Sequence, residues 1–132
     1  MKRVDHIGIA VRDLNEVLPY YTETLGCPLL KIEEVESQKV RVAFIDAGNI
    51  KLELLEPMDS SGAVYKFIEK RGEGIHHIAF GVEDIEKRME ELRKNGVHLL
   101  SEQANPGAGG ALVAFLHPKS SNGVLYELCE KQ

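Results

Sequence analysis

The chain carries one short segment twice, and this repeat constrains its fold more than any other feature. His6 stands in the segment DHIGIAVRDL and His77 in the segment HHIAFGVEDI, 71 positions apart (77 − 6 = 71). The same register is kept by Ile7 and Ile78, by Val11 and Val82, and by Asp13 and Asp84. Similarity at a fixed offset indicates a repeated structural unit. We therefore expect two copies of one module, with equivalent histidines related by a pseudo-twofold axis, as a shared metal site would need.

Length and composition restrict the classes of protein to which this chain can belong. Its 132 residues suit a single domain that buries about two thirds of its unfolded surface. The net charge of −5 disfavours nucleic acid as a partner, and no apolar stretch approaches the ~18 residues of a membrane span. We expect a cytoplasmic protein with neither kind of partner. Cys27 and Cys129 lack a C-x-x-C partner, and we expect them to be reduced thiols in or near the core.

The first half of the sequence predicts the element order β-α-β-β-β. Residues 3–11 are β-branched and apolar, which is typical of a strand. Asp13, with Glu16 three residues later, forms a capping-box pattern for a helix over residues 14–25. Pro19 falls inside this helix, where its missing backbone N–H bends or delays the helix. Three further strands are predicted over residues 29–35, 40–47 and 50–55.

The second half repeats this order after a connecting helix over residues 60–71. Residues 106–110 are too rich in glycine for regular structure, and we expect a loop whose backbone a ligand can approach closely. The pattern predicts an α+β fold, in which two β-α-β-β-β modules at about 3–58 and 74–130 form a single domain. The elements predicted in the second half are a helix over 85–95, capped by Asp84, and strands over 75–82, 97–100, 112–117 and 124–129.

The last strand of each half carries one glutamate among apolar residues. These are Glu53 in the segment KLELL and Glu127 in the segment LYELC. A carboxylate on the buried face of a strand is costly unless it meets a cation. The histidines of the first strands, His6 and His77, are the natural partners, at nearly equal spacings from the two glutamates. The duplication therefore predicts the same His/Glu pair twice.

Two imidazoles and two carboxylates suit a divalent metal ion with open positions for water or substrate. We take Co²⁺ as the first choice, ahead of Mn²⁺, Ni²⁺, Fe²⁺ and Zn²⁺. The alternative is that each histidine is a hydrogen-bonded core residue and each glutamate points to solvent. The occurrence of all four at equivalent repeat positions argues against that alternative. His76 must face away from its neighbour His77 and is left out of the metal site, and His98 is expected on the surface.

At these residues the sequence resembles the methylmalonyl-CoA epimerases of the vicinal oxygen chelate superfamily. The resemblance covers nearly the whole chain, and its more specific segments are GEGIHH at residues 72–77 and HPKS at residues 117–120. The His/Glu quartet is also shared with glyoxalase I. The resemblance implies curved sheets of paired modules that enclose one divalent ion, and interconversion of (2R)- and (2S)-methylmalonyl-CoA by a homodimer. It implies that the ion is bound by His6, Glu53, His77 and Glu127.

The implied reaction removes a proton from the carbon between a thioester and a carboxylate, so negative charge develops on the thioester oxygen. A divalent ion stabilises this charge as a Lewis acid. Epimerisation also needs proton delivery to the opposite face of the carbon, ordinarily from a second acid/base group. Glu127 matches a family carboxylate and is the candidate for the first group. Some epimerases have an acidic residue where this chain has Val42, so the second group stays open among Glu36, Glu53 and a water on the metal.

Binding of coenzyme A is expected at the turn after Pro118. Lys119 and Ser120 are the candidates to contact its phosphates, and the alternative for Lys119 is a solvated surface charge. Two other functions stay open. One is glyoxalase I (lactoylglutathione lyase), which moves a proton on a glutathione hemithioacetal with the same metal ligands. The other is a metal-free drug-binding protein of the bleomycin-resistance type, against which the intact quartet argues.

Overall fold

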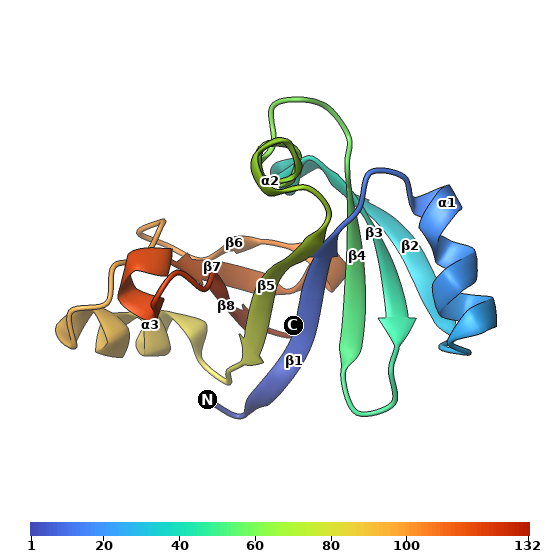
Figure 1. Ribbon diagram of the computed structural model, residues 1–132. Helices are drawn as coiled ribbons and strands as arrows, with labels where there is room; N and C mark the ends of the chain where they lie inside the picture. Colours follow the sequence, from blue (N-terminus) through green and yellow to red (C-terminus); the bar gives the residue numbers. More distant parts are fainter. The chain divides into compact units, whose positions relative to one another are not determined.

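The computed structural model describes residues 1–132, which form two compact units (Figure 1). The first unit comprises His6–His76, and the second comprises Met1–Asp5 together with His77–Gln132. Each unit contains one copy of the repeat and follows the predicted order β-α-β-β-β. The expected α+β class is therefore confirmed.

The first unit is built on four strands that pair in the order β2-β3-β4-β1. The pairs β2–β3 and β3–β4 are antiparallel, whereas β1–β4 is parallel. The predicted strands are confirmed, with ends shifted by at most two residues. Their bounds are β1 Arg3–Ala10, β2 Leu29–Val35, β3 Val40–Asp46 and β4 Lys51–Pro57.

The first helix changes its form at the proline. Helix α1 spans Leu14–Pro19 and is continued by a π-helical turn at Tyr20–Thr24, so the predicted helical segment exists but is not a single α-helix. Pro19 has no N–H to donate, and its ring crowds the preceding turn of the helix. The chain beyond it therefore follows the wider π spacing, in which Leu25 N–H donates to the carbonyl oxygen of Tyr20 at 2.9 Å. Asp13 caps α1 as predicted.

Helix α1 divides the sheet of the first unit into two faces. Ala43 and Ile45 of β3 and Leu54 of β4 pack with Leu14 of α1 in one buried cluster, so their side of the sheet is the helix face. Side chains alternate along a strand. The intervening residues therefore point to the other side, which we call the histidine face. In this unit it carries His6, Gly8, Val42, Phe44, Glu53 and Leu55.

Helix α2, Ala63–Arg71, follows β4 and begins three residues later than predicted. The backbone makes a close approach at Gly62, the residue that precedes the helix. A Cβ atom on Gly62 would lie 2.9 Å from Cβ of Lys39 and 3.2 Å from the carbonyl oxygen of Gln38. Lys39 itself adopts a left-handed conformation (φ 56°) in the turn between β2 and β3. The segment before α2 is thus shaped by contact with this turn.

The second unit repeats the arrangement, with strands in the order β5-β8-β7-β6 (Figure 1). One predicted element, the strand over residues 97–100, is wrong. Its only ladder contact is an isolated bridge between Leu99 and Leu116. Val97 and Leu99 pack into the apolar cluster under helix α3, so their alternation reflects burial and not a ladder. The observed bounds are β5 Gly74–Gly81, α3 Ile85–Lys94, β6 Asn105–Pro106, β7 Leu112–Leu116 and β8 Tyr126–Glu130.

The glycine-rich segment is more regular than expected. Pro106 ends the short strand β6, and residues Ala108–Gly110 form a 3-10 turn. Gly109 and Gly110 both have positive φ angles, 69° and 74°, which their lack of a side chain permits. The predicted loop is therefore a strand end followed by a tight turn.

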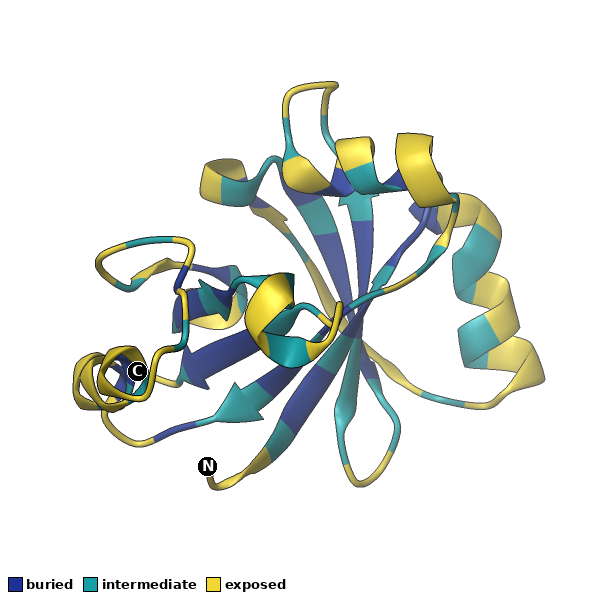
Figure 2. Cartoon of the chain, turned by 60° about the vertical axis from the view of Figure 1, so that its left-hand side comes forward, coloured by how far each residue is buried: buried dark blue, intermediate teal, exposed yellow.

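Both units bury the middle of their strands and expose the outer sides of their helices (Figure 2). In the second unit, Leu128 lies under α3 on the helix face, while Ala79, Val113 and Cys129 form a cluster on the other side, the histidine face of that unit. Cys27 packs beneath α1, so each thiol lies in or beside an apolar cluster, as expected. The longest helix has ten residues, and no helix has the length and apolar surface that crossing a bilayer requires.

Candidate metal centre

The first His/Glu pair forms on the histidine face of the first unit. In the parallel ladder between β1 and β4, Gly8 stands opposite Glu53, and His6 precedes Gly8 by two residues on the same face. His6 Nδ1 lies 3.2 Å from Glu53 Oε2. The two residues are only 3% and 5% exposed. The structure therefore confirms that β1 and β4 bring this histidine and this glutamate together in the interior.

The second pair forms at the equivalent place in the second unit, through the other imidazole nitrogen. In the parallel ladder between β5 and β8, Ala79 stands opposite Glu127, and His77 precedes Ala79 by two residues. His77 Nε2 lies 3.1 Å from Glu127 Oε1, and the two residues are 6% and 3% exposed. A small residue, Gly8 or Ala79, thus stands beside each carboxylate. The duplicated sequence produces a duplicated His/Glu contact.

Each carboxylate also faces a phenylalanine on its other neighbouring strand. Phe44 is the antiparallel partner of Glu53, and Phe115 is the partner of Glu127. The ring of Phe115 meets the ring of His77 edge to face, with 5.5 Å between centroids. Sequence reasoning missed these aromatic residues, although their offset in the repeat (115 − 44 = 71) equals that of the histidines.

The donor atoms of each pair fit two neighbouring ligands of one cation. Nitrogen and carboxylate ligands lie about 2.0–2.2 Å from a Zn²⁺-like ion, so two of them at angles of 90–110° are about 3.0–3.4 Å apart. The measured separations of 3.2 Å and 3.1 Å fall in this range. Apolar neighbours such as Ala79 and Val113 are buried on the same face, and a water-poor surrounding strengthens the attraction between a carboxylate and a cation.

A second repeated glutamate serves the fold and not the metal. Glu56 Oε2 accepts the backbone N–H of Leu14 at 2.9 Å, and Glu130 Oε1 accepts that of Ile85 at 2.8 Å. Each carboxylate therefore satisfies an N–H at the start of the helix that covers its unit, where negative charge is favourable. The signal that could have revealed them is the spacing E-x-x-E, which occurs in both β4 and β8.

The other histidines lie outside both pairs. His76 packs edge to face against Phe67 of α2, with 5.0 Å between ring centroids. His98 is exposed, and its ring lies 5.2 Å from that of His117. The expectations that His76 faces away from His77 and that His98 lies on the surface are confirmed.

The predicted coenzyme A residues lie on the turn between β7 and β8. Lys119 and Ser120 are exposed within a 3-10 turn at Pro118–Ser121. The Ser120 hydroxyl accepts the backbone N–H of His98 at 3.0 Å, so this oxygen already has a structural role. The turn follows the last pair of the β7–β8 ladder, Leu116 with Tyr126, and the pair of Phe115 with Glu127 precedes that one.

Val42 is fully buried on the histidine face of β3, directly opposite Leu55 of β4. Glu36, one of the candidates for the second proton-transfer group, lies in the turn after β2 with its side chain 72% exposed. Glu36 pairs with Lys39 at 3.0 Å, and this hydrogen bond and charge raise the pKa of Lys39 above its usual value. Glu36 is thus a solvated charge at a strand end.

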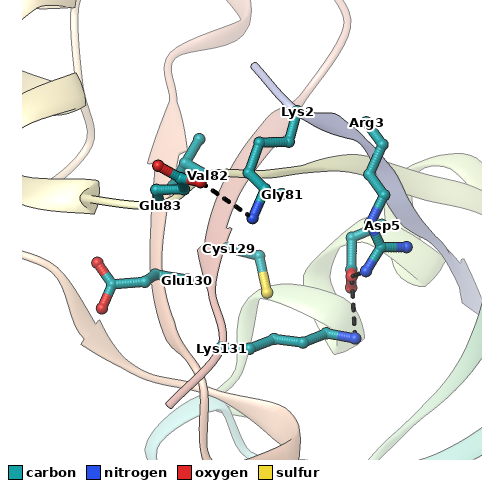
Figure 3. A pocket seen from close by; sticks show the side chains of 9 residues that line it. All are labelled: Lys2, Arg3, Asp5, Gly81, Val82, Glu83, Cys129, Glu130 and Lys131. Atoms are coloured by element: carbon teal, nitrogen blue, oxygen red, sulfur yellow. Dashed lines mark ion pairs between the residues drawn. The ribbon is translucent and has the colours of Figure 1, made fainter.

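A polar pocket in the second unit holds another buried carboxylate, that of Asp5 (Figure 3). Asp5 is 3% exposed, and its Oδ1 lies 3.3 Å from Arg3 Nη2 and 3.2 Å from Lys131 Nζ. Two side-chain cations therefore compensate its charge, and this arrangement needs no metal ion. The pocket also contains the ion pair between Lys2 and Glu83 (Figure 3).

Comparison with known proteins places these features in context. Residues 5–115 match the model of the glyoxalase/bleomycin resistance protein/dioxygenase superfamily. The chain is 45% identical to the uncharacterised protein YqjC of Bacillus subtilis, over 98% of this chain and 93% of the relative. It is 40% identical to an ethylmalonyl-CoA/methylmalonyl-CoA epimerase of Cereibacter sphaeroides, over 96% of each chain.

A solved structure shows the same fold with a ligand. It is a methylmalonyl-CoA epimerase in complex with methylmalonyl-CoA and NH4+, and it is 39% identical to this chain. The superposition has a TM-score of 0.93 and covers 99% of this chain and 95% of the other.

Proposed function

The chain belongs to the glyoxalase/bleomycin resistance protein/dioxygenase superfamily, and from this membership we propose that it is a methylmalonyl-CoA epimerase. This enzyme is an isomerase that interconverts the (2R) and (2S) forms of an acyl-CoA thioester. The observation that carries the proposal is the near full-length similarity to such epimerases in a chain that keeps both buried His/Glu pairs. The substrate in this proposal is methylmalonyl-CoA.

We propose that His6, Glu53, His77 and Glu127 bind one divalent ion, with Co²⁺ as the first choice and Mn²⁺, Ni²⁺ or Zn²⁺ as alternatives. The support is chemical: two nitrogen and two oxygen donors at equivalent repeat positions, each pair spaced as neighbouring ligands would be. When bound, a divalent ion supplies Lewis-acid stabilisation for negative charge on the thioester oxygen. On this proposal the two modules act as a single domain.

Glu127 is proposed to take the proton from the C2 carbon of the substrate and to return it. A carboxylate in a water-poor setting is a stronger base than one in solvent, and Glu127 is buried beside Ala79 and Phe115. His77 positions this carboxylate through the 3.1 Å contact. Phe115 stands opposite Glu127 in the β7–β8 ladder and gives it an apolar neighbour.

Lys119 is proposed to bind a phosphate of coenzyme A, with Ser120 as its neighbour in the turn. An exposed ammonium group is a suitable partner for a flexible, doubly charged phosphate. Since the Ser120 hydroxyl is held by the His98 N–H, we expect Lys119→Ala to raise KM more than Ser120→Ala does. Neither change should lower kcat, because neither residue acts at C2.

The metal proposal is tested by stoichiometry. Elemental analysis after loading with Co²⁺ and desalting should find one ion per chain, and His6→Ala or His77→Ala should each remove it. His98→Ala is the matched control and should retain the ion. Two ions per chain, or retention of the ion by both His6→Ala and His77→Ala, would contradict a single shared centre.

The reaction is tested by solvent exchange. Metal-loaded protein incubated with (2R)-methylmalonyl-CoA in D₂O should incorporate deuterium at C2 and produce the (2S) epimer. Turnover of the glutathione hemithioacetal without exchange of methylmalonyl-CoA would identify glyoxalase I instead. No affinity for any divalent ion, together with no turnover of either substrate, would favour a drug-binding protein. A homodimer and a cytoplasmic location stay predictions, to be tested by sedimentation and by fractionation of cells.

A further inference from the structure

We infer that Glu33 is the second acid/base group of the epimerisation. This chain has Val42 where some epimerases have an acidic residue, and valine cannot transfer a proton. This inference rests on the proposed function. Glu33 belongs to β2, the edge strand of the first unit, and it is the antiparallel partner of Val42. Its carboxylate lies on the histidine face, the face that also carries Glu53.

The ladder places Glu33 on the histidine face. Residues directly opposite each other in an antiparallel pair point to the same side, with Cβ atoms about 4.5–5.5 Å apart. Glu33 therefore shares the side of Val42, and Val42 shares that of Leu55. Phe44, two residues after Val42, stands opposite Glu53. A continuous face thus runs from the metal-ligand candidate Glu53 to Glu33.

An irregularity in β2 establishes this orientation. The register shifts between Leu29 and Lys31, so Leu29 pairs with Ile45 of the helix face while Lys31 pairs with Phe44 of the histidine face. Such a bulge changes the side to which the following residues point. Lys31 confirms the result, because its ammonium nitrogen lies 5.1 Å from the centroid of the Phe44 ring.

Glu33 combines burial and access in the way that an acid/base group requires. Its side chain is 30% exposed, and its Oε1 lies 3.7 Å from Lys31 Nζ. A substrate can reach such a carboxylate, whereas its ladder partner Val42 is fully buried. Lys31, on the same face, contributes a positive charge that favours an anionic substrate beside this glutamate.

The neighbouring acidic residues do not meet these conditions. Glu34 pairs with Arg41 in the ladder and lies on the helix face. Glu56 is on that face too, where it accepts the Leu14 N–H. Glu36 lies beyond the strand, in the turn after β2, with its side chain 72% exposed. Of the acidic side chains around β2, Glu33 is the one that joins the face of Glu53.

The second module carries no acid at the corresponding place. Val113 of β7 is the repeat equivalent of Val42 (113 − 42 = 71), and its partner on the edge strand β6 is Asn105. An amide does not transfer a proton under these conditions. The first module thus offers Glu33 where the second offers Asn105, while Glu127 is the proposed acid/base group of the second module.

The test follows deuterium incorporation from each epimer separately. In wild-type protein both (2R)- and (2S)-methylmalonyl-CoA should exchange C2 hydrogen in D₂O. Glu33→Gln should stop epimerisation and lower exchange from one epimer by about 10²–10⁴-fold, while the other epimer still exchanges through Glu127. Glu127→Gln should show the opposite preference. Glu34→Gln, which alters the adjacent residue on the helix face, is the matched control and should behave as wild type.

The remaining outcomes separate the inference about Glu33 from the proposal that the protein is an epimerase. Unchanged exchange from both epimers in Glu33→Gln would overturn the inference and leave Glu53 or water as the second group. Equal loss from both epimers, with metal content unchanged by elemental analysis, would also overturn it, since a one-sided base affects one epimer. Glu33→Asp should recover part of the lost exchange. If wild-type protein exchanges neither epimer, the epimerase proposal itself fails.

Discussion

Replacing Glu56 by glutamine tests whether the repeated glutamates of β4 and β8 hold the helices onto the sheets. Glu56 accepts two hydrogen bonds, from Leu14 N–H at 2.9 Å and from Arg41 Nη1 at 3.0 Å, and its side chain is 17% exposed. A glutamine has one carbonyl oxygen. When that oxygen accepts a hydrogen bond from one of the two donors, the amide NH₂ group faces the other donor and cannot accept from it. The substitution therefore removes both the charge and one bond.

The magnitude follows from these contacts. Hydrogen bonds to charged groups contribute about 1.5–3 kcal/mol, and a charge at a helix N-terminus contributes about 0.3–1 kcal/mol. Because the glutamine keeps one bond and the site is partly exposed, we expect a loss of about 2 kcal/mol in the free energy of unfolding. For a chain of this size this corresponds to a fall of about 6 °C in Tm. Glu130→Gln should cost less, about 1 kcal/mol, because the second bond of Glu130 is to the exposed side chain of Gln132.

The assay is urea unfolding followed by far-ultraviolet circular dichroism, with excess chelator so that metal binding does not contribute. Glu16→Gln is the matched control, because Glu16 is an exposed acid in the first turn of α1 and its replacement should change the free energy by less than about 0.5 kcal/mol. A Glu56→Gln protein as stable as this control would refute the capping argument. Epimerase activity below the unfolding transition should be unchanged, since Glu56 lies on the helix face.

Three further predictions concern a close backbone contact and the metal centre. Gly62→Ala should lower the free energy of unfolding by about 1–3 kcal/mol, because the new Cβ would lie 2.9 Å from Cβ of Lys39. Urea unfolding should show a lower midpoint, and an unchanged midpoint would show that the turn at Lys39 moves aside at no cost. Glu127→Gln should keep appreciable metal but lose most deuterium exchange, and undiminished turnover would refute its role as a base. Saturating Co²⁺ should raise Tm in wild-type protein by linkage and leave Tm unchanged in His6→Ala, as differential scanning calorimetry would show.

The repeat and its alternation were sufficient to predict most of the architecture. The strand bounds of the first unit and the helices α1–α3 follow from apolar periodicity, capping residues and glycine positions. The predictions failed where a local signal had two physical causes. Val97 and Leu99 alternate because they pack under α3, and the same alternation is typical of a strand. Pro19 predicted a disturbed helix, but it did not predict that the chain beyond it would continue as a π-helical turn.

The His/Glu pairs were predictable because the repeat marks equivalent positions and because burial alternates along each strand. A carboxylate amid apolar residues of a strand requires a partner, and the duplicated histidines were equivalent in register. The helix-capping role of Glu56 and Glu130 was not predicted. The sequence shows their spacing, but only the folded strand and helix bring each carboxylate to a backbone N–H more than 40 residues away.

Periodicity and burial act along each strand, and they were enough to predict the duplication, the element order and the pairing of His6 with Glu53 and of His77 with Glu127. Which strands are neighbours in the sheet, and in what register, depends on the folded chain, whose β1–β4 and β5–β8 ladders confirm this pairing. The bulge in β2 and the ladder to β3 bring Glu33 to the side of Val42, a relation between residues that the order of amino acids does not contain. Side-chain direction in a sheet depends on pairing and on irregularities such as bulges, so the choice of the second proton-transfer group had to await the fold.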